Sequence, residues 1–114
     1  MTAFRVWAPV AGRAEVEVAG RRYPMSREAA PPSRDWPGWW SAEVPAAVTG
    51  VGTEAPGVGT DYGFRLDDGE LLPDPRSLRQ PFGIRGPSRT YDHSAFGWTD
   101  RRWRGGPLHG SVIY

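Results

Sequence analysis

The stretch DYGFRLDDG, Asp61 to Gly69, carries the pattern that decides the fold. Tyr62, Phe64 and Leu66 alternate with polar or small residues, which is the two-residue period of a strand with one buried face. Asp68-Gly69 follows directly, and both residues tolerate the positive φ angles of a tight hairpin turn. The stretch therefore predicts a strand that runs into a hairpin.

The same alternation recurs in AFRVWAPV (3–10), AEVEVAG (14–20) and GWWSAEV (38–44), and RRYPM (21–25) predicts a short edge strand. Helix signals are nearly absent. Several short strands separated by turns predict an all-β, immunoglobulin-like sandwich with a long irregular C-terminal segment. The faces expected to form its core carry Phe4, Val6, Ala8, Val16, Val18, Trp40, Ala42, Val44, Tyr62, Phe64 and Leu66.

Composition narrows the class of protein. The chain has 114 residues, enough for one domain, and its six tryptophans argue against disorder despite 15 glycines and 12 prolines. A net charge of +1 gives no broad attraction to nucleic acid or to an anionic membrane. Disulfides and thiolate chemistry are excluded because there is no cysteine. Without a signal-peptide pattern or a long apolar run, we expect a cytoplasmic protein with no membrane contact and no cofactor.

The C-terminal part of the chain has a different character. From Pro73 to Gly110, turn residues are frequent and no period is sustained. A structureless segment of this length is unusual in a small domain, so it is either functional or packs against something outside the chain. SVIY, 111–114, resembles the first half of a strand. We therefore divide the chain into a sandwich (1–78), an irregular segment (79–110) and the start of a strand (111–114).

A group of carboxylates, Asp67, Asp68, Glu70 and Asp74, surrounds the predicted hairpin. Glycosidases hold two carboxyl groups at a fixed separation with one of them protonated, whereas a hairpin turn is solvated and mobile. Aspartate is also favoured in turns because its side chain accepts hydrogen bonds from nearby backbone N–H groups. We interpret these residues as turn chemistry and predict no catalytic residue. The spacing of a calcium loop is missing as well.

Other candidate sites are weaker. His93 and His109 stand far apart with no cysteine, so no metal site is expected. The run RRWRGG (101–106) could contact phosphate, but with so small a net charge we interpret it as a loop whose arginines cover a tryptophan. By alternation, Trp7 and Trp39 lie on the face opposite the core. They predict either a stacking platform for a sugar or an interface with another domain.

Several strings together resemble the maltooligosyltrehalose trehalohydrolases, glycoside hydrolases of the α-amylase superfamily. They are FRVWAP, GWWSAEV, GTDYGFRLDDGELLPDPRS, QPFGIRGPS and PLHGSVIY, which follow the family's order over nearly the whole chain. The resemblance covers only the N-terminal domain of that enzyme. It implies an early-set immunoglobulin-like sandwich, related to family-48 carbohydrate-binding modules, that packs against a catalytic (β/α)₈ barrel.

The resemblance also implies roles for individual segments. SVIY would open the first barrel strand, and 79–110 would run along the barrel, which is the expected partner. The catalytic carboxylates belong to the barrel, so none is transferred to this chain. Phe82, Phe96, Trp98 and Trp103 are the candidate barrel contacts. The expected function is a non-catalytic accessory domain of an enzyme that releases trehalose from maltooligosyltrehalose.

Two alternatives remain open, a free-standing α-glucan-binding module and a protein-interaction domain. Glycogen-binding relatives carry a tryptophan two positions after the hairpin glycine, where this chain has Leu71. A glucan-binding platform would therefore have to be built from Trp7, Tyr23 and Trp39.

Overall fold

The structure is a computed structural model that describes residues 1–29, 36–49 and 59–114. Its strands are β1 (Thr2–Trp7), β2 (Ala14–Val18), β3 (Arg21–Pro24), β4 (Ser26–Arg27), β5 (Trp39–Val44), β6 (Asp61–Leu66) and β7 (Ser88–Arg89). Two short helical turns complete the set, α1 (Ala46–Thr49) and the 3₁₀ turn η1 (His93–Ala95). The stretch 30–35 and the Gly/Thr-rich stretch 50–58 lie outside the described residues.

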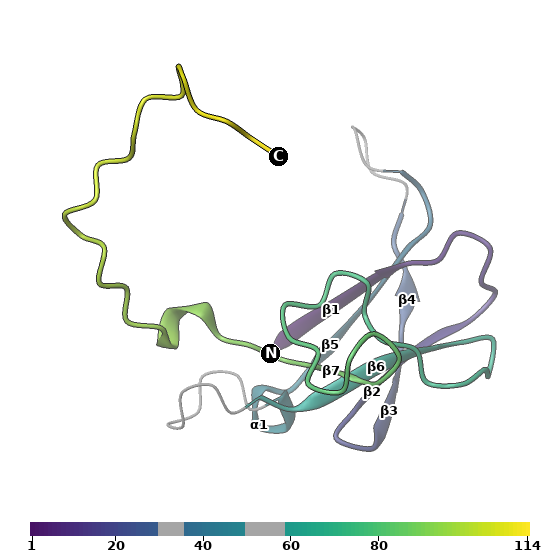
Figure 1. The fold of residues 1–114 in the computed structure, drawn as a ribbon. Coiled ribbons are helices and arrows are strands. Elements are labelled where there is room, and N and C mark those ends of the chain that lie inside the picture. Colours follow the sequence, from purple (N-terminus) through teal and green to yellow (C-terminus); the bar gives the residue numbers. More distant parts are fainter. Residues whose placement is uncertain (30–35, 50–58) are drawn as a thin grey trace.

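The strands form two antiparallel sheets. The first has the order β1-β5-β4 and the second β3-β2-β6-β7. Both layers are visible in Figure 1, with β1 and β7 on the same side of the molecule. The chain passes from the second sheet to the first at Met25, the single residue between β3 and β4. The predicted all-β sandwich is thus confirmed, and its immunoglobulin-like character stays a prediction.

The core lies where the inner faces of the two sheets meet. Phe64 and Val16 are fully buried in the second sheet, and the rings of Phe4 and Tyr62 pack across the interface with centroids 4.8 Å apart. Trp40, predicted to be in the core, is buried and donates its indole N–H to the carbonyl of Ala8 at 3.1 Å. This bond satisfies the polar atom that burial would otherwise leave unpaired.

Both hairpin turns of the second sheet use positive φ angles. Ala19 and Gly20 connect β2 to β3, with φ angles of 50° and 76°. After β6, the positive angles fall on Asp67 and Asp68, at 50° and 59°, and Gly69 donates its N–H to the carbonyl of Leu66. From the sequence we expected the turn one residue later, at Asp68-Gly69. The register is set one residue earlier because aspartate tolerates the left-handed conformation and the Asp67 carboxylate binds the loop before β2.

The second sheet extends into the segment that we predicted to be irregular. β7 pairs with β6, and Thr90 donates its N–H to the carbonyl of Thr60. The Thr90 hydroxyl also donates to the carbonyl of Thr49 at the end of α1, a short helix that the sequence did not predict. The residues after Thr90 run away from the sandwich (Figure 1). The division into domains at 78 and 110 stays a prediction.

Candidate functional site

The carboxylates around the β6 hairpin hold backbone and hydroxyl groups in place. An oxygen of Asp67 accepts the N–H groups of Gly12 and Arg13 at 2.9 and 3.0 Å, which joins the hairpin to the loop before β2. Asp74 accepts the Tyr62 hydroxyl proton at 2.7 Å, and Asp68 forms an exposed ion pair with Arg13. These contacts agree with the interpretation of the cluster as turn chemistry.

The Tyr62–Asp74 pair is a partly buried titratable contact. Burial, followed by the hydrogen bond to the Asp74 carboxylate, raises the pKa of Tyr62 far above its ordinary value. The phenol is therefore protonated at any physiological pH and acts as a fixed donor. It ties the segment after the hairpin to the core.

Trp7 and Trp39 occupy the predicted outer face. They are directly opposite each other in the β1–β5 pair, so both side chains project from the same side of the first sheet. Trp7 is half exposed, and its indole N–H donates to the carbonyl of Pro37 at 3.0 Å. Trp39 is partly buried. Alternation along the strands was sufficient to find this pair.

Two arginines cover the Trp39 ring. The guanidinium of Arg5 lies 4.6 Å from the ring centroid and that of Arg76 lies 5.4 Å away, both within cation–π range. Arg5 is held in place by two 2.7 Å hydrogen bonds to Glu28, and this bonding lowers the pKa of Glu28. A sugar that stacked on Trp39 would have to displace at least one of these arginines. No pattern in the sequence indicated this cover, because Arg76 comes from a loop without periodicity.

Tyr23 lies apart from the tryptophan pair. It belongs to β3 of the second sheet, opposite Val16, and packs partly against the core. It borders a shallow groove of about 640 Å³ that also contacts Arg5 and Ser41 of the first sheet. The structure brings Trp7 and Trp39 together, whereas Tyr23 belongs to the opposite sheet.

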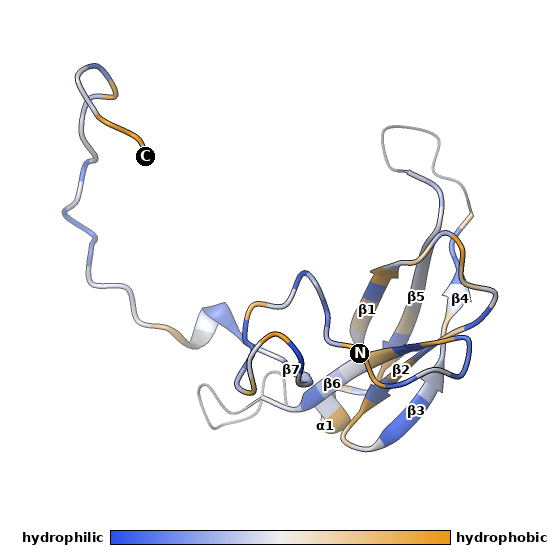
Figure 2. Cartoon of the chain, turned by 45° about the vertical axis from the view of Figure 1, so that its right-hand side comes forward, coloured by the Kyte–Doolittle hydropathy of each residue, from blue (hydrophilic) through white to orange (hydrophobic). Residues whose placement is uncertain are grey.

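The candidate barrel contacts are all exposed. Phe96 and Trp98 pack edge-to-face with centroids 4.9 Å apart, and Trp103 stands alone with 76% of its surface exposed. Phe82 is also exposed and packs beside the Arg89 guanidinium. Figure 2 shows that apolar residues recur along the segment that leaves the sandwich and at its C-terminal end. Residues 111–114 form no strand and remain exposed.

The outer face of the second sheet carries a network of ion pairs. Arg13 donates to Glu15 at 2.8 Å, and Arg65 donates to Glu17 at 2.7 Å. The hydrogen bond from Arg13 lowers the pKa of Glu15. Glu15, expected on a polar face, is nevertheless buried, because the arginine side chains fold over it. The network is consistent with a structural role for this face.

Among the described residues, no group of three or more histidine or acidic side chains could hold a metal ion. No helix in the described ranges is long and apolar enough to cross a membrane.

Comparison with known proteins confirms the resemblance seen in the sequence. No family model matches the chain. Curated relatives named malto-oligosyltrehalose trehalohydrolase are 43% identical in Rhizobium sp. (strain M-11), 39% in Brevibacterium helvolum and 36% in Mycobacterium tuberculosis. The alignments cover 97%, 97% and 100% of this chain, but only 17% of each relative. The chain thus spans about a sixth of the length of the relatives it matches.

A solved structure supports the same relationship. The chain superposes on the crystal structure of a "Putative alpha Amylase" from Salmonella typhimurium with a TM-score of 0.69 and 28% sequence identity. The match covers 92% of this chain and 15% of that protein. The likeness therefore concerns a small part of a much larger protein of the α-amylase type.

Proposed function

We propose that this chain, the N-terminal part of a trehalohydrolase-like protein of the α-amylase family, is an accessory domain that supports a catalytic barrel. The complete protein would hydrolyse the α-1,4 bond next to the trehalose end of maltooligosyltrehalose and release trehalose. The catalytic carboxylates would belong to the barrel. The sandwich would hold the barrel in its folded form and contribute loops near its substrate cleft.

One observation carries the accessory role. The run after Thr90 exposes a series of large apolar side chains, namely Phe96, Trp98, Trp103, Leu108, Val112, Ile113 and Tyr114. Large apolar side chains gathered along one exposed segment indicate a surface that another part of the protein covers. The relatives supply a candidate for that cover, because five-sixths of their length lies outside the match.

The test uses the full-length protein that contains this chain. We expect it to release trehalose from maltotriosyltrehalose and to act far more slowly on maltopentaose, which lacks the trehalose end. Removal of residues 1–90 should lower the thermal midpoint of the remaining protein and reduce its rate. Equal rates on the two substrates would refute the activity, and an unchanged midpoint and rate after the deletion would refute the accessory role.

Glucan binding is the second candidate, and the Trp7–Trp39 pair on the outer face of the first sheet supports it. Titration of the 114-residue chain with maltoheptaose would be followed by tryptophan fluorescence. Binding at millimolar or lower concentrations that Trp7→Ala and Trp39→Ala both abolish would support a glucan-binding module. If no binding were seen, the pair would be a packing surface. The two arginines that cover Trp39 support this second interpretation.

A further inference from the structure

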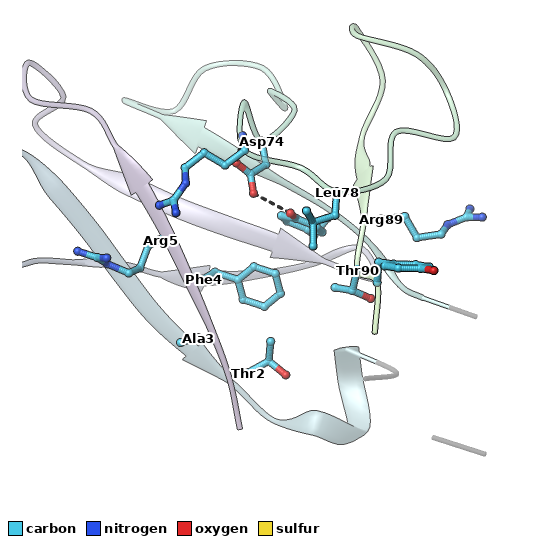
Figure 3. Close-up of a pocket in the computed structure, with 11 residues that line it drawn as sticks. Thr2, Ala3, Phe4, Arg5, Asp74, Leu78, Arg89 and Thr90 are labelled. Carbon is cyan, nitrogen blue, oxygen red and sulfur yellow. Dashed lines mark hydrogen bonds between the residues drawn. The ribbon is translucent and has the colours of Figure 1, made fainter. Parts of the chain in front are cut away.

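A cavity of about 260 Å³ opens on the side of the sandwich where β1 faces the segment from Asp74 to Tyr91. Phe4 and Tyr62, both buried, form its floor, and Leu78 stands at its mouth with 68% of its surface exposed. Figure 3 shows Phe4 projecting from β1 toward Thr90, with Leu78 above the ring. The cavity therefore combines an apolar floor with an exposed apolar rim.

The cavity exists because the two sheets do not close against each other on this side. β1 is the last strand of the first sheet and β7 the last strand of the second. The loop that spans the gap is fixed at several points. The N–H of Asp74 donates to the hydroxyl of Ser88 at 3.0 Å, and the N–H of Arg89 donates to the carbonyl of Arg79 at 2.9 Å. The walls are thus preformed, which lowers the cost of binding.

The three arginines at the mouth differ in whether they have a carboxylate partner. Arg5 pairs with Glu28, and Arg89 forms hydrogen bonds of 2.6 and 3.2 Å to Asp61. Arg76 also lines the cavity, but within the described ranges no carboxylate lies within 4.0 Å of its guanidinium. Its contact is the face of Trp39. The carboxylate of Asp74 lines the cavity too, and it accepts the Tyr62 hydroxyl at 2.7 Å and the backbone N–H of Arg76 at 2.8 Å. A ligand at this mouth would therefore meet the rings of the floor and one guanidinium without a carboxylate partner in the described part of the chain.

We propose that this cavity receives an apolar side chain from the catalytic part of the same polypeptide, next to a carboxylate that pairs with Arg76. This inference rests on the accessory role proposed above. Tyr91 lines the cavity and comes two residues after the end of β7, so the segment that follows it starts beside the mouth. Such a tether gives a high effective concentration and allows a small contact to be occupied.

The experiment is hydrogen exchange, measured by mass spectrometry on the full-length protein, in peptides that cover residues 74–91. Leu78→Asp places a charge at the apolar rim, and Arg76→Glu repels the expected carboxylate. Both side chains are on the surface, so the sandwich should fold. The matched controls are Val10→Asp, at a residue that is 96% exposed, and Arg21→Glu, on β3 at the opposite edge of the second sheet.

We expect both cavity variants to speed exchange in these peptides about tenfold, as truncation of one interface anchor does, and both controls to match the wild type. Leu78→Ala should give a smaller change in the same direction. Equal exchange in cavity and control variants would overturn the proposal, as would protection of the same peptides by maltoheptaose in the 114-residue chain.

Trehalose release is measured separately. If the protein released no trehalose but residues 74–91 remained protected, only the proposed function would be refuted. If it released trehalose normally but residues 74–91 were unprotected, only the docking would be refuted.

Discussion

Replacement of Asp67 by alanine tests whether the carboxylates of the β6 hairpin are structural. The carboxylate accepts two backbone N–H groups, at 2.9 and 3.0 Å, and the residue has a φ angle of 50°. Two hydrogen bonds at an exposed site contribute about 1–2 kcal/mol. Alanine in the left-handed region costs about 1 kcal/mol more. We therefore expect Asp67→Ala to lower the free energy of unfolding by about 2–3 kcal/mol, or about 10 °C in thermal midpoint.

Two companion variants separate the two contributions. Asp67→Gly keeps the positive φ angle at no steric cost but removes the acceptor, so it should lose about 1–2 kcal/mol. Asp67→Asn keeps both an acceptor oxygen and tolerance of the left-handed region, so it should lose about 1 kcal/mol or less. The assay is urea denaturation of the 114-residue chain, followed by tryptophan fluorescence.

The order of the three variants decides the outcome. If Asp67→Asn were as damaging as Asp67→Ala, the hydrogen bonds and the turn conformation would not explain the role of this residue. Unfolding that is unchanged in all three variants would also refute the structural interpretation.

Three other substitutions test the core, the close packing beside the hairpin and the outer ion pair. Phe64→Ala should cost about 3–5 kcal/mol in urea denaturation, because the ring is 1% exposed, and a loss below 1 kcal/mol would place it outside the core. Gly63→Ala should lower the free energy of unfolding by about 2 kcal/mol, because a Cβ atom there would lie 2.7 Å from the carbonyl oxygen of Leu72. If this substitution left stability unchanged, the β6 hairpin would have to open easily. Glu28→Gln should reduce stability near pH 7, where the Arg5 pair is intact. The difference from the wild type should disappear as the pH falls below the ordinary pKa of 4.5 and through the lowered pKa of Glu28, and an equal difference at pH 3 and pH 7 would contradict the pair.

Alternation in the sequence was enough to identify β1, β2, β5 and β6 and their buried faces. Phe4, Val16, Trp40 and Phe64 are buried as predicted, because a period of two fixes which side of a strand meets the core. It also placed Trp7 and Trp39 on the outer face, where they prove to be cross-strand neighbours.

Periodicity could not reveal contacts made by the irregular loops. The position of Arg76 over Trp39 and the strand β7 depend on tertiary packing of a segment without a repeating pattern. Glu15 likewise pairs with Arg13 and with Arg22 on the neighbouring strand, and alternation along one strand does not predict such pairs. The turn at Asp67 was displaced by one residue because a distant loop, at Gly12, selects the register.

The bond from Thr90 to the end of α1 has a consequence for synthesis of the protein. β1 pairs with β5, and the second sheet is completed only by β7 and Thr90, so the sandwich cannot close until nearly all of its sequence has been made. At roughly 5–20 residues per second, synthesis of the run after Thr90 takes a second or more. A small β-domain of high contact order can use that interval to fold. The sandwich can therefore begin to fold while the exposed segment, residues 91–114, is still emerging.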